Sequence, residues 1–296
     1  MNKYKYPMED RIFDIVTYIM LCTIVISIAY PIIYIISCSF SSPQAVMGGR
    51  VWLLPVEFSL AGYETIFSYS AVWSGYANTI FYTVAGTFVN LAMTILAAYP
   101  LSRKDLYGRG IFTLIITFTM FFGGGMIPSY LLISKLGLIN TRASMIIPSA
   151  ISVWNVIITR TFFQNTIPDE MLEAARIDGC SDIKFLLRIV IPLSSTIIAV
   201  NLLFYGVGHW NSYFDALLYL NKADLHPLQM VLRRVLILNS FEGRISFQMS
   251  SYSARVGIRE LLKYSLIIVA TAPMMVVYPF LKNYFVKGVM IGSLKG

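Results

Sequence analysis

The residue types that usually carry out catalysis are scarce in this 296-residue chain. It contains two histidines, His209 and His226, and neither lies in a His-Glu-x-x-His metal motif. Its three cysteines are widely separated, so they favour neither a disulfide framework nor a zinc site. They are Cys22, Cys38 and Cys180. No glycine-rich loop ends in Gly-Lys-Ser or Gly-Lys-Thr, the pattern that holds nucleotide phosphates. The sequence therefore predicts no catalytic site, no metal and no cofactor bound by this chain.

The chemistry that the sequence does favour is docking of another protein, on the polar segment 166–188. Thr166 is expected to cap a helix that begins at Pro168, with Asp169 completing a capping box. Gly179 suits the left-handed position that ends a helix, and Ser181 can cap a second one. That second helix should end at Pro192 and present four apolar residues on one face. They are Ile183, Leu186, Leu187 and Val190.

Two small residues give this segment its predicted surface. Ala174 and Ala175 carry almost no side chain, so the backbone of a partner could approach the first helix closely. The alternative is an amphipathic surface helix with no docking role, of the kind that many membrane proteins contain.

The elements that position this segment are predicted to cross a membrane. Of all residues 57% are hydrophobic and only 13% are charged, and the mean hydropathy is +0.68, which is far from a soluble composition. A run of about 18 or more uncharged residues can span a bilayer as a helix. Six regions meet or nearly meet this criterion, and the fourth is the shortest. They are residues 12–40, 78–101, 111–134, 143–160, 189–215 and 264–282.

Basic residues beside the spans predict that both termini lie in the cytoplasm. The first apolar run is about twice the length of a signal-peptide core, so it is interpreted as a membrane helix. The loop 221–263 should face outward, yet it carries seven basic residues. These could steer an acidic cargo, dock an acidic binding protein, or lie at the membrane surface. The net charge of +8 comes mainly from the flanks of the spans and does not require nucleic acid as a partner.

A composite motif in the docking segment resembles a known family. Glu173-Ala-Ala is followed after three residues by Gly179, and after nine more by Ile189-Val-Ile-Pro192. This pattern is similar to the signature cytoplasmic loop of bacterial ABC importer permeases, with Ile191 where the family usually has Leu. Arg160-Thr-Phe-Phe and Ile167-Pro168 resemble the carbohydrate-uptake branch. The resemblance implies an all-α, six-span type I importer fold whose coupling helices lie between spans four and five. The coupling residues that it implies are Glu173, Ala174, Ala175, Asp178 and Gly179.

The C-terminal residues provide a second match. Tyr284-Phe-Val-Lys-Gly288 and Gly292-Ser-Leu-Lys-Gly296 resemble the tail of maltose-permease-like subunits, in particular a Gram-positive branch that handles complex oligosaccharides. The resemblance implies that the tail 283–296 reaches between two ATPase subunits. Gly288, Gly292 and Gly296 are its expected contact residues, because glycine permits close approach of another backbone.

Together these matches imply a single 1–296 permease domain, not an enzyme, in the plasma membrane. The implied partners are a second homologous permease, two ATPase subunits that bind ATP, an extracellular sugar-binding protein and membrane lipid. The alternative is an ion-coupled secondary transporter or a channel subunit, but neither charged sites at mid-membrane nor an inverted repeat is evident. Residues that contact substrate are not assigned. Asp215 is interpreted as structural in preference to substrate-binding, and Gly123-Gly-Gly125 could line a pathway or mark a helix break.

Overall fold

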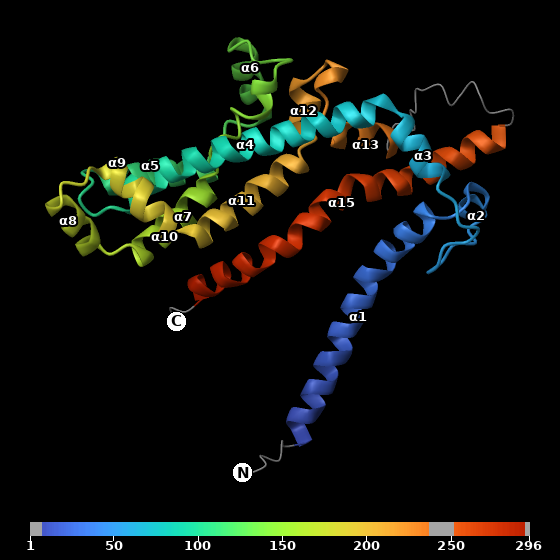
Figure 1. The fold of residues 1–296 in the computed structure, drawn as a ribbon, viewed down its shortest axis with the longest axis horizontal. Helices are drawn as coiled ribbons and strands as arrows, with labels where there is room; N and C mark the ends of the chain where they lie inside the picture. The colour runs from blue at the N-terminus through green and yellow to red at the C-terminus, as the bar shows by residue number, and fades with distance from the viewer. Residues whose placement is uncertain (1–7, 237–251, 294–296) are drawn as a thin grey trace. The chain divides into compact units, whose positions relative to one another are not determined.

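The computed structural model describes residues 8–236 and 252–293, and all the regular structure in these ranges is helical (Figure 1). The prediction of an all-α chain is therefore confirmed for the described part of the protein. The chain divides into two compact units, which are described separately below.

The first unit contains residues Met1–Ser70 and Leu232–Thr271. Its helices are α1 (Met8–Ser39), α2 (Pro43–Met47), α3 (Ala61–Ser68) and the first part of α15 (Tyr252–Ser293). A small core joins the end of α1 to the loop that follows and to α15. Its buried members are Cys38, Ala45, Val46, Val51 and Leu261. Gly62 packs so closely on Ser265 that no larger residue fits at that position without a shift.

The second unit contains residues Ala71–Val231 and Ala272–Gly296. It is built along α4, a 33-residue helix from Ser70 to Ser102. The remaining helices are α5 (Arg109–Phe121), α6 (Met126–Lys135), η1 (Arg142–Met145), α7 (Val153–Thr166), α8 (Asp169–Ile177), α9 (Asp182–Phe185), α10 (Ile191–Leu193), α11 (Ser195–Trp210), α12 (Phe214–Tyr219), η3 (Ala223–Leu225) and α13 (Leu228–Leu236). A π-helical turn, Leu186–Val190, joins α9 to α10.

The buried face of α4 is a stripe of polar and small residues spaced four apart. They are Asn78, Tyr82, Gly86, Asn90, Thr94, Ala98 and Ser102. Residues at this spacing lie on one side of a helix. Asn78 Nδ2 donates to the carbonyl of Asp224 at 2.6 Å, and Tyr82 OH donates to the carbonyl of Leu225 at 2.9 Å. These bonds attach the segment after α12 to one end of α4.

The middle of the same stripe binds α11. Asn90 Oδ1 lies 2.6 Å from His209 Nε2, and Thr94 Oγ1 lies 2.6 Å from the hydroxyl of Tyr205. The Asn90 amide also donates to the carbonyl of Ser149. Polar groups inside a membrane protein must find protein partners, so these pairs fix how α4 and α11 meet.

Three described helices are long and apolar enough to cross a membrane: Asp10–Ser39 within α1, Ser70–Ser102, and Val256–Val277 within α15. Two bent pairs of helices also satisfy this criterion, which gives up to five spans by length and composition among the described residues. The count of six spans therefore remains a prediction.

Two of the expected spans are not straight helices. In the third, 111–134, the chain bends by 111° between α5 and α6. The chain leaves the helix at Gly123–Gly125, where Gly125 has a φ of +82°, so these glycines mark a helix break. In the fifth, 189–215, the chain bends by 82° at Ser194, two residues after Pro192, which cannot donate a helical hydrogen bond.

The expected fourth span, 143–160, is not one continuous helix in the structure. It is divided into the short helix η1, an irregular stretch over 146–152, and α7. Pro148 lacks an N–H, and the Ser152 side chain accepts a hydrogen bond from the backbone N–H of Asn155, which starts a new helix. With 14 residues, α7 is shorter than the roughly 20 that cross a bilayer.

The contact between Gly86 and His209 provides a test of this packing. A methyl group at Gly86 would overlap the His209 ring, so Gly86→Ala should destabilise the unit by about 1–3 kcal/mol, as overpacking does. Thermal unfolding of the purified transporter measures the effect. Gly208→Ala is the control, because that glycine is also within a helix but has nothing within 4 Å of the added methyl. Equal melting temperatures for the two variants would show that α4 and α11 do not meet as described.

Candidate functional site

Helix α8, at the centre of the predicted docking segment, has one buried and one exposed face. Leu172 and Ala175 are 2% and 8% exposed and pack in the main core of the second unit. Glu173 and Ala174 are exposed, and Ile177 is 87% exposed. The structure therefore places Ala175, which was expected at the docking surface, in the core of its own chain. The reason is helical geometry, since Ala175 follows Leu172 by three residues and so lies on the same face.

The start of α8 differs from the expected capping box. Thr166 is the last residue of α7, and Pro168 caps α8 without a side-chain hydrogen bond. Asp169 does not cap the helix. Its carboxylate pairs with Lys104 Nζ at 2.9 Å and with the Arg103 guanidinium at 3.1 Å. The capping-box pattern predicted that the Asp169 carboxylate would bond a backbone N–H at the start of the helix. Instead it binds two cations, Arg103 and Lys104, that are far away in the sequence.

The end of α8 confirms the sequence prediction. Gly179 adopts a φ of +75° and donates its N–H to the carbonyl of Arg176 at 3.0 Å, while Cys180 donates to the carbonyl of Ala175 at 2.8 Å. These two bonds form a Schellman motif, which satisfies carbonyls at a helix end. Asp178 immediately precedes the turn and is exposed. Ser181 then caps α9 by accepting from the N–H of Lys184 at 3.4 Å.

The second helix ends one residue beyond the expected Pro192. It continues from α9 through the π-helical turn and α10 as far as Leu193. Its four apolar residues are not buried together: Leu186 and Val190 are buried, whereas Ile183 and Leu187 are 72% and 58% exposed. Phe185, which the sequence reasoning did not single out, is fully buried in the main core.

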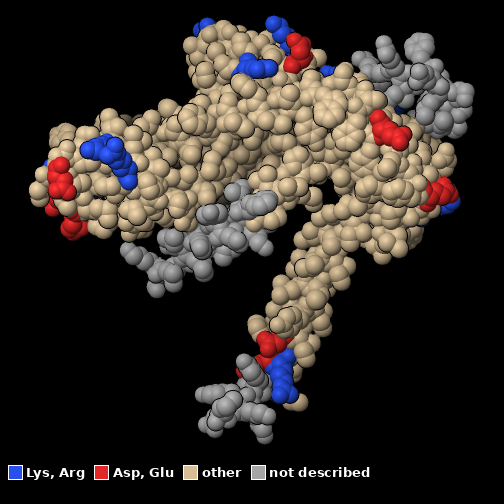
Figure 2. Space-filling view, viewed as in Figure 1, with Lys and Arg blue, Asp and Glu red and all other residues tan. Residues whose placement is uncertain are grey.

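The exposed sides of the two helices carry apolar residues among charged ones. Figure 2 shows acidic and basic side chains gathered over the end of the molecule where Figure 1 places α8 and α9. We call this the coupling surface. It comprises Glu173, Ala174, Ile177, Asp178, Gly179 and Ile183. Exposed apolar side chains rimmed by charge are characteristic of protein-binding sites.

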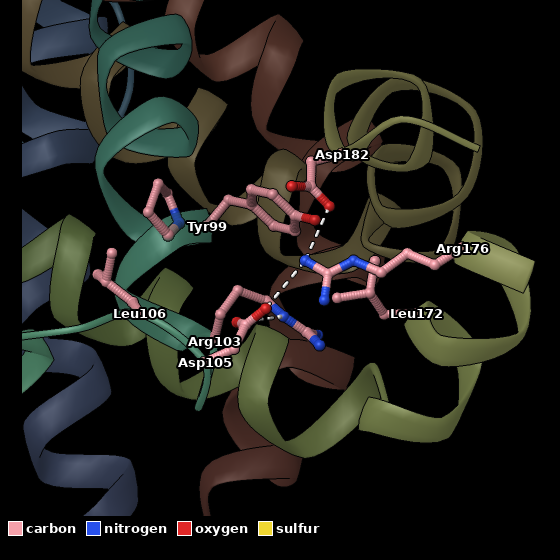
Figure 3. A pocket seen from close by; sticks show the side chains of 8 residues that line it. Tyr99, Arg103, Asp105, Leu106, Leu172, Arg176 and Asp182 are labelled. Carbon is pink, nitrogen blue, oxygen red and sulfur yellow. Dashed lines mark hydrogen bonds and ion pairs between the residues drawn. The ribbon is translucent and has the colours of Figure 1, made fainter. Parts of the chain in front are cut away.

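Behind this surface, ion pairs connect α8 to the loop between α4 and α5. Arg176 Nη2 lies 2.9 Å from Asp105 Oδ2 and 3.2 Å from Asp182 Oδ1, and Figure 3 shows its side chain reaching toward both acids. Arg103 is nine-tenths buried. The group borders a cavity of about 280 Å³ whose other lining residues include Tyr99, Leu106 and Leu172. The sequence reasoning missed the Arg103-Lys104-Asp105 run. The sequence signal that could have identified this run is two basic residues followed by an acidic one, directly after the second span.

The ion pairs shift the protonation of their members toward the charged forms. The hydrogen bond from Lys104, aided by the nearby Arg103, holds the pKa of the Asp169 carboxyl below its ordinary value. Hydrogen bonds to Asp105 and Asp182 raise the pKa of the Arg176 guanidinium. Because the pKa of Asp169 is lowered, its charge is lost only at acidic pH, and the pairs are complete at neutral pH.

The other predicted site residues are placed as follows. Gly288 and Gly292 lie in the helical backbone of α15, and Gly296 lies outside the described residues. Asp215 is half-buried in α12. Across 8–236 and 252–293 there is no group of three histidine, cysteine or acidic side chains suited to holding a metal ion.

Comparisons with known proteins agree on one family, although no protein-family model matches the sequence. The chain is 40% identical over 290 residues to the polygalacturonan/rhamnogalacturonan transport system permease protein YtcP of Bacillus subtilis, covering 98% of this chain and all of the relative. It is also 40% identical to protein LplC of the same organism, covering 97% of this chain and 96% of LplC. A crystal structure of a bacterial ABC transporter that imports the acidic polysaccharide alginate contains a similar chain. That match has a TM-score of 0.89 and 36% identity, and it covers 96% of this chain and all of the other.

The turn at Gly179 provides a test of the site's local geometry. A valine there would be forced into a left-handed conformation, so Gly179→Val should cost about 1–2 kcal/mol and Gly179→Asn less. Hydrogen exchange of the amides of α8 and α9 reports the loosening. Gly110→Val is the matched control, because Gly110 lies in a helix without positive φ and with open space around it. Equal exchange in the two valine variants would contradict the strained turn.

Proposed function

Because this chain belongs to the permease subunits of bacterial carbohydrate ABC importers, we propose that its coupling surface docks on a partner ATPase subunit. A permease of this kind forms part of the pathway for a sugar, and ATP hydrolysis takes place on a separate polypeptide. The chain is not itself an enzyme. The alternative assignments to an ion-coupled transporter or a channel are set aside by the family.

The observation that carries the docking proposal is the exposure of Ile177 and Ile183 beside Ala174. An isoleucine side chain gains about 1.5–3 kcal/mol when it is fully buried, so two that remain exposed next to a flat alanine favour a protein partner. Glu173 and Asp178 can form charge-assisted hydrogen bonds at its rim. Ala175 contributes to docking indirectly, because its small buried side chain lets α8 pack close to the core.

We also propose the composition of the complete importer from the family to which this chain belongs. The full importer contains a second homologous permease, two ATPase subunits and an extracellular sugar-binding protein, and this chain lies in the plasma membrane. Both termini face the cytoplasm, which is supported by the basic residues in the predicted cytoplasmic segments. The C-terminal tail, with Gly288, Gly292 and Gly296, reaches toward the ATPase subunits. No cofactor is bound by the permease chain.

A bulky charge on the coupling surface should separate the permease from its ATPase. Ala174→Arg places a guanidinium where a partner backbone must approach, so co-purification of the ATPase and sugar uptake should both fall at least tenfold. The control is Gln164→Arg, which adds the same group to an exposed position of the neighbouring helix α7. Normal levels of the permease in the membrane show that the variant folds. Unchanged co-purification with Ala174→Arg would refute the docking surface.

We also propose that the cargo is an oligosaccharide that bears carboxylate groups. The support is that the solved importer imports alginate, and that a relative at 40% identity serves polygalacturonan/rhamnogalacturonan transport. The basic residues predicted in the loop 221–263 are consistent with this cargo. Arg233 and Arg234 belong to α13, and Arg244 lies outside the described residues.

Cargo class can be measured by ATP hydrolysis of the reconstituted importer with its binding protein. Galacturonate oligomers should stimulate hydrolysis about tenfold more than the same oligomers reduced to neutral galactose, because each charge-assisted bond contributes roughly 1.5–3 kcal/mol. Both sugars are compared with the binding protein saturated. Greater stimulation by the neutral oligomers would contradict an acidic cargo and leave the assignment to the carbohydrate importers intact.

A further inference from the structure

Helix α8 is held at both ends by ion pairs to a single short stretch of chain. At its start Asp169 pairs with Arg103 and Lys104, and in its last turn Arg176 pairs with Asp105. Arg103, Lys104 and Asp105 are consecutive residues that directly follow the last residue of α4. We call this stretch with its two α8 partners the α8 clasp.

The charges of the clasp match the polarity of the helix. The loop presents two cations and then an anion, and α8 presents an anion at its N-terminus and a cation near its C-terminus. Each helix charge also complements the partial charge of its own helix end. Asp169 and Arg176 are about 10 Å apart along the axis, at 1.5 Å per residue, a distance that the loop spans with the long side chains of Arg103, Lys104 and Arg176. Reversing α8 would place like charges opposite each other.

The clasp is attached firmly to α4. The N–H of Arg103 donates to the carbonyl of Pro100 at 3.1 Å, and the Arg109 guanidinium donates to the carbonyl of Arg103 at 3.3 Å. Arg160 Nε of α7 donates to the carbonyl of Leu101 at 3.0 Å. Hydrogen bonds therefore connect the start of the loop to the end of α4 and to α7.

Apolar packing by itself would not fix the direction of α8. Leu172 and Ala175 anchor its middle, but contacts of this kind are non-directional, and the cavity beside Tyr99 and Leu172 leaves room for sliding. Figure 3 shows Arg176 passing beside this space toward Asp105 and Asp182. The ion pairs are the contacts that resist rotation and sliding at the two ends.

We infer that the α8 clasp carries displacement of the coupling surface to α4, with Asp105 and Arg176 as positioning residues. This inference rests on the proposed function, because it requires an ATPase that moves α8. The side chains of Arg176 and Asp105 are each 47% exposed, and ion pairs at such positions add little to folding stability. Their effect is therefore expected in the amount of sugar moved per ATP hydrolysed, with little change in folding.

The test compares sugar import with ATP hydrolysis in the reconstituted complete importer. Arg176→Ala and Asp105→Ala should each lower the sugar moved per ATP about three- to tenfold, while the permease retains its ATPase partner and its melting temperature. The double variant Asp105→Arg with Arg176→Asp should restore the ratio, because it forms the ion pair between the loop and α8 again with the two charges exchanged. Lys184→Gln, which removes an exposed α9 charge that forms no ion pair with the described residues, is the control and should leave the ratio unchanged.

The outcomes separate the clasp from the docking proposal. An unchanged ratio in both alanine variants would overturn the clasp, as would a lowered ratio that the double variant fails to restore. In either case, loss of the ATPase with Ala174→Arg would still support the coupling surface. A loss of the ATPase partner caused by Arg176→Ala itself would also overturn the clasp, since it would place Arg176 in docking.

Discussion

The second unit depends on a requirement that a membrane imposes, namely that buried polar groups find partners within the protein. Hydrocarbon offers no hydrogen bonds, so an unpaired amide or hydroxyl costs several kcal/mol there. The buried stripe of α4 carries such groups at regular intervals. Four of them have partners in other parts of the chain, whereas Ser102 donates to the carbonyl of Tyr99 in its own helix. Asn78 bonds the segment after α12, Asn90 bonds both the stretch before α7 and His209, and Thr94 bonds Tyr205. The position of α4 is therefore fixed by directional bonds as well as by packing.

A helix fixed in this way can connect its two ends mechanically. With 33 residues at 1.5 Å each, α4 is about 50 Å long. Near one end Thr79 Oγ1 accepts from the backbone N–H of Leu228 at 2.8 Å, beside the bonds from Asn78 and Tyr82 to the preceding loop. At the other end Arg103 begins the α8 clasp. The ion pairs at one end of α4 and the hydrogen bonds near the other therefore connect α8 with the loop at the far end.

A structural feature could be predicted from the sequence when the residues that determine it are close together in the chain. The turn at Gly179 and the cap at Ser181 were predictable, because each involves residues within five positions of one another. The role of Asp169 was not, since its cations lie more than 60 residues earlier and α7 takes Thr166 for its own last turn. Similarly, Arg176 and Asp105 are 71 residues apart. Hydrophobicity located the apolar runs but not the breaks within them, because an average over a window hides one residue with unusual geometry. The local signals of Gly123–Gly125 and Pro192 were needed to indicate the breaks near Gly125 and Ser194.

The division of α8 into a buried and an exposed face suits it to the docking proposed above. A nine-residue helix is too short to be stable alone, so it requires tertiary contacts. Leu172 and Ala175 supply those contacts inside the chain, which leaves Ala174 and Ile177 on the opposite side with nothing in the described structure covering them. The ion pairs bind the two ends of the helix and do not occupy that outer face. A helix secured at its ends and along its inner side can therefore receive a partner on its outer side, and force applied there acts on the whole helix and, through its ends, on α4.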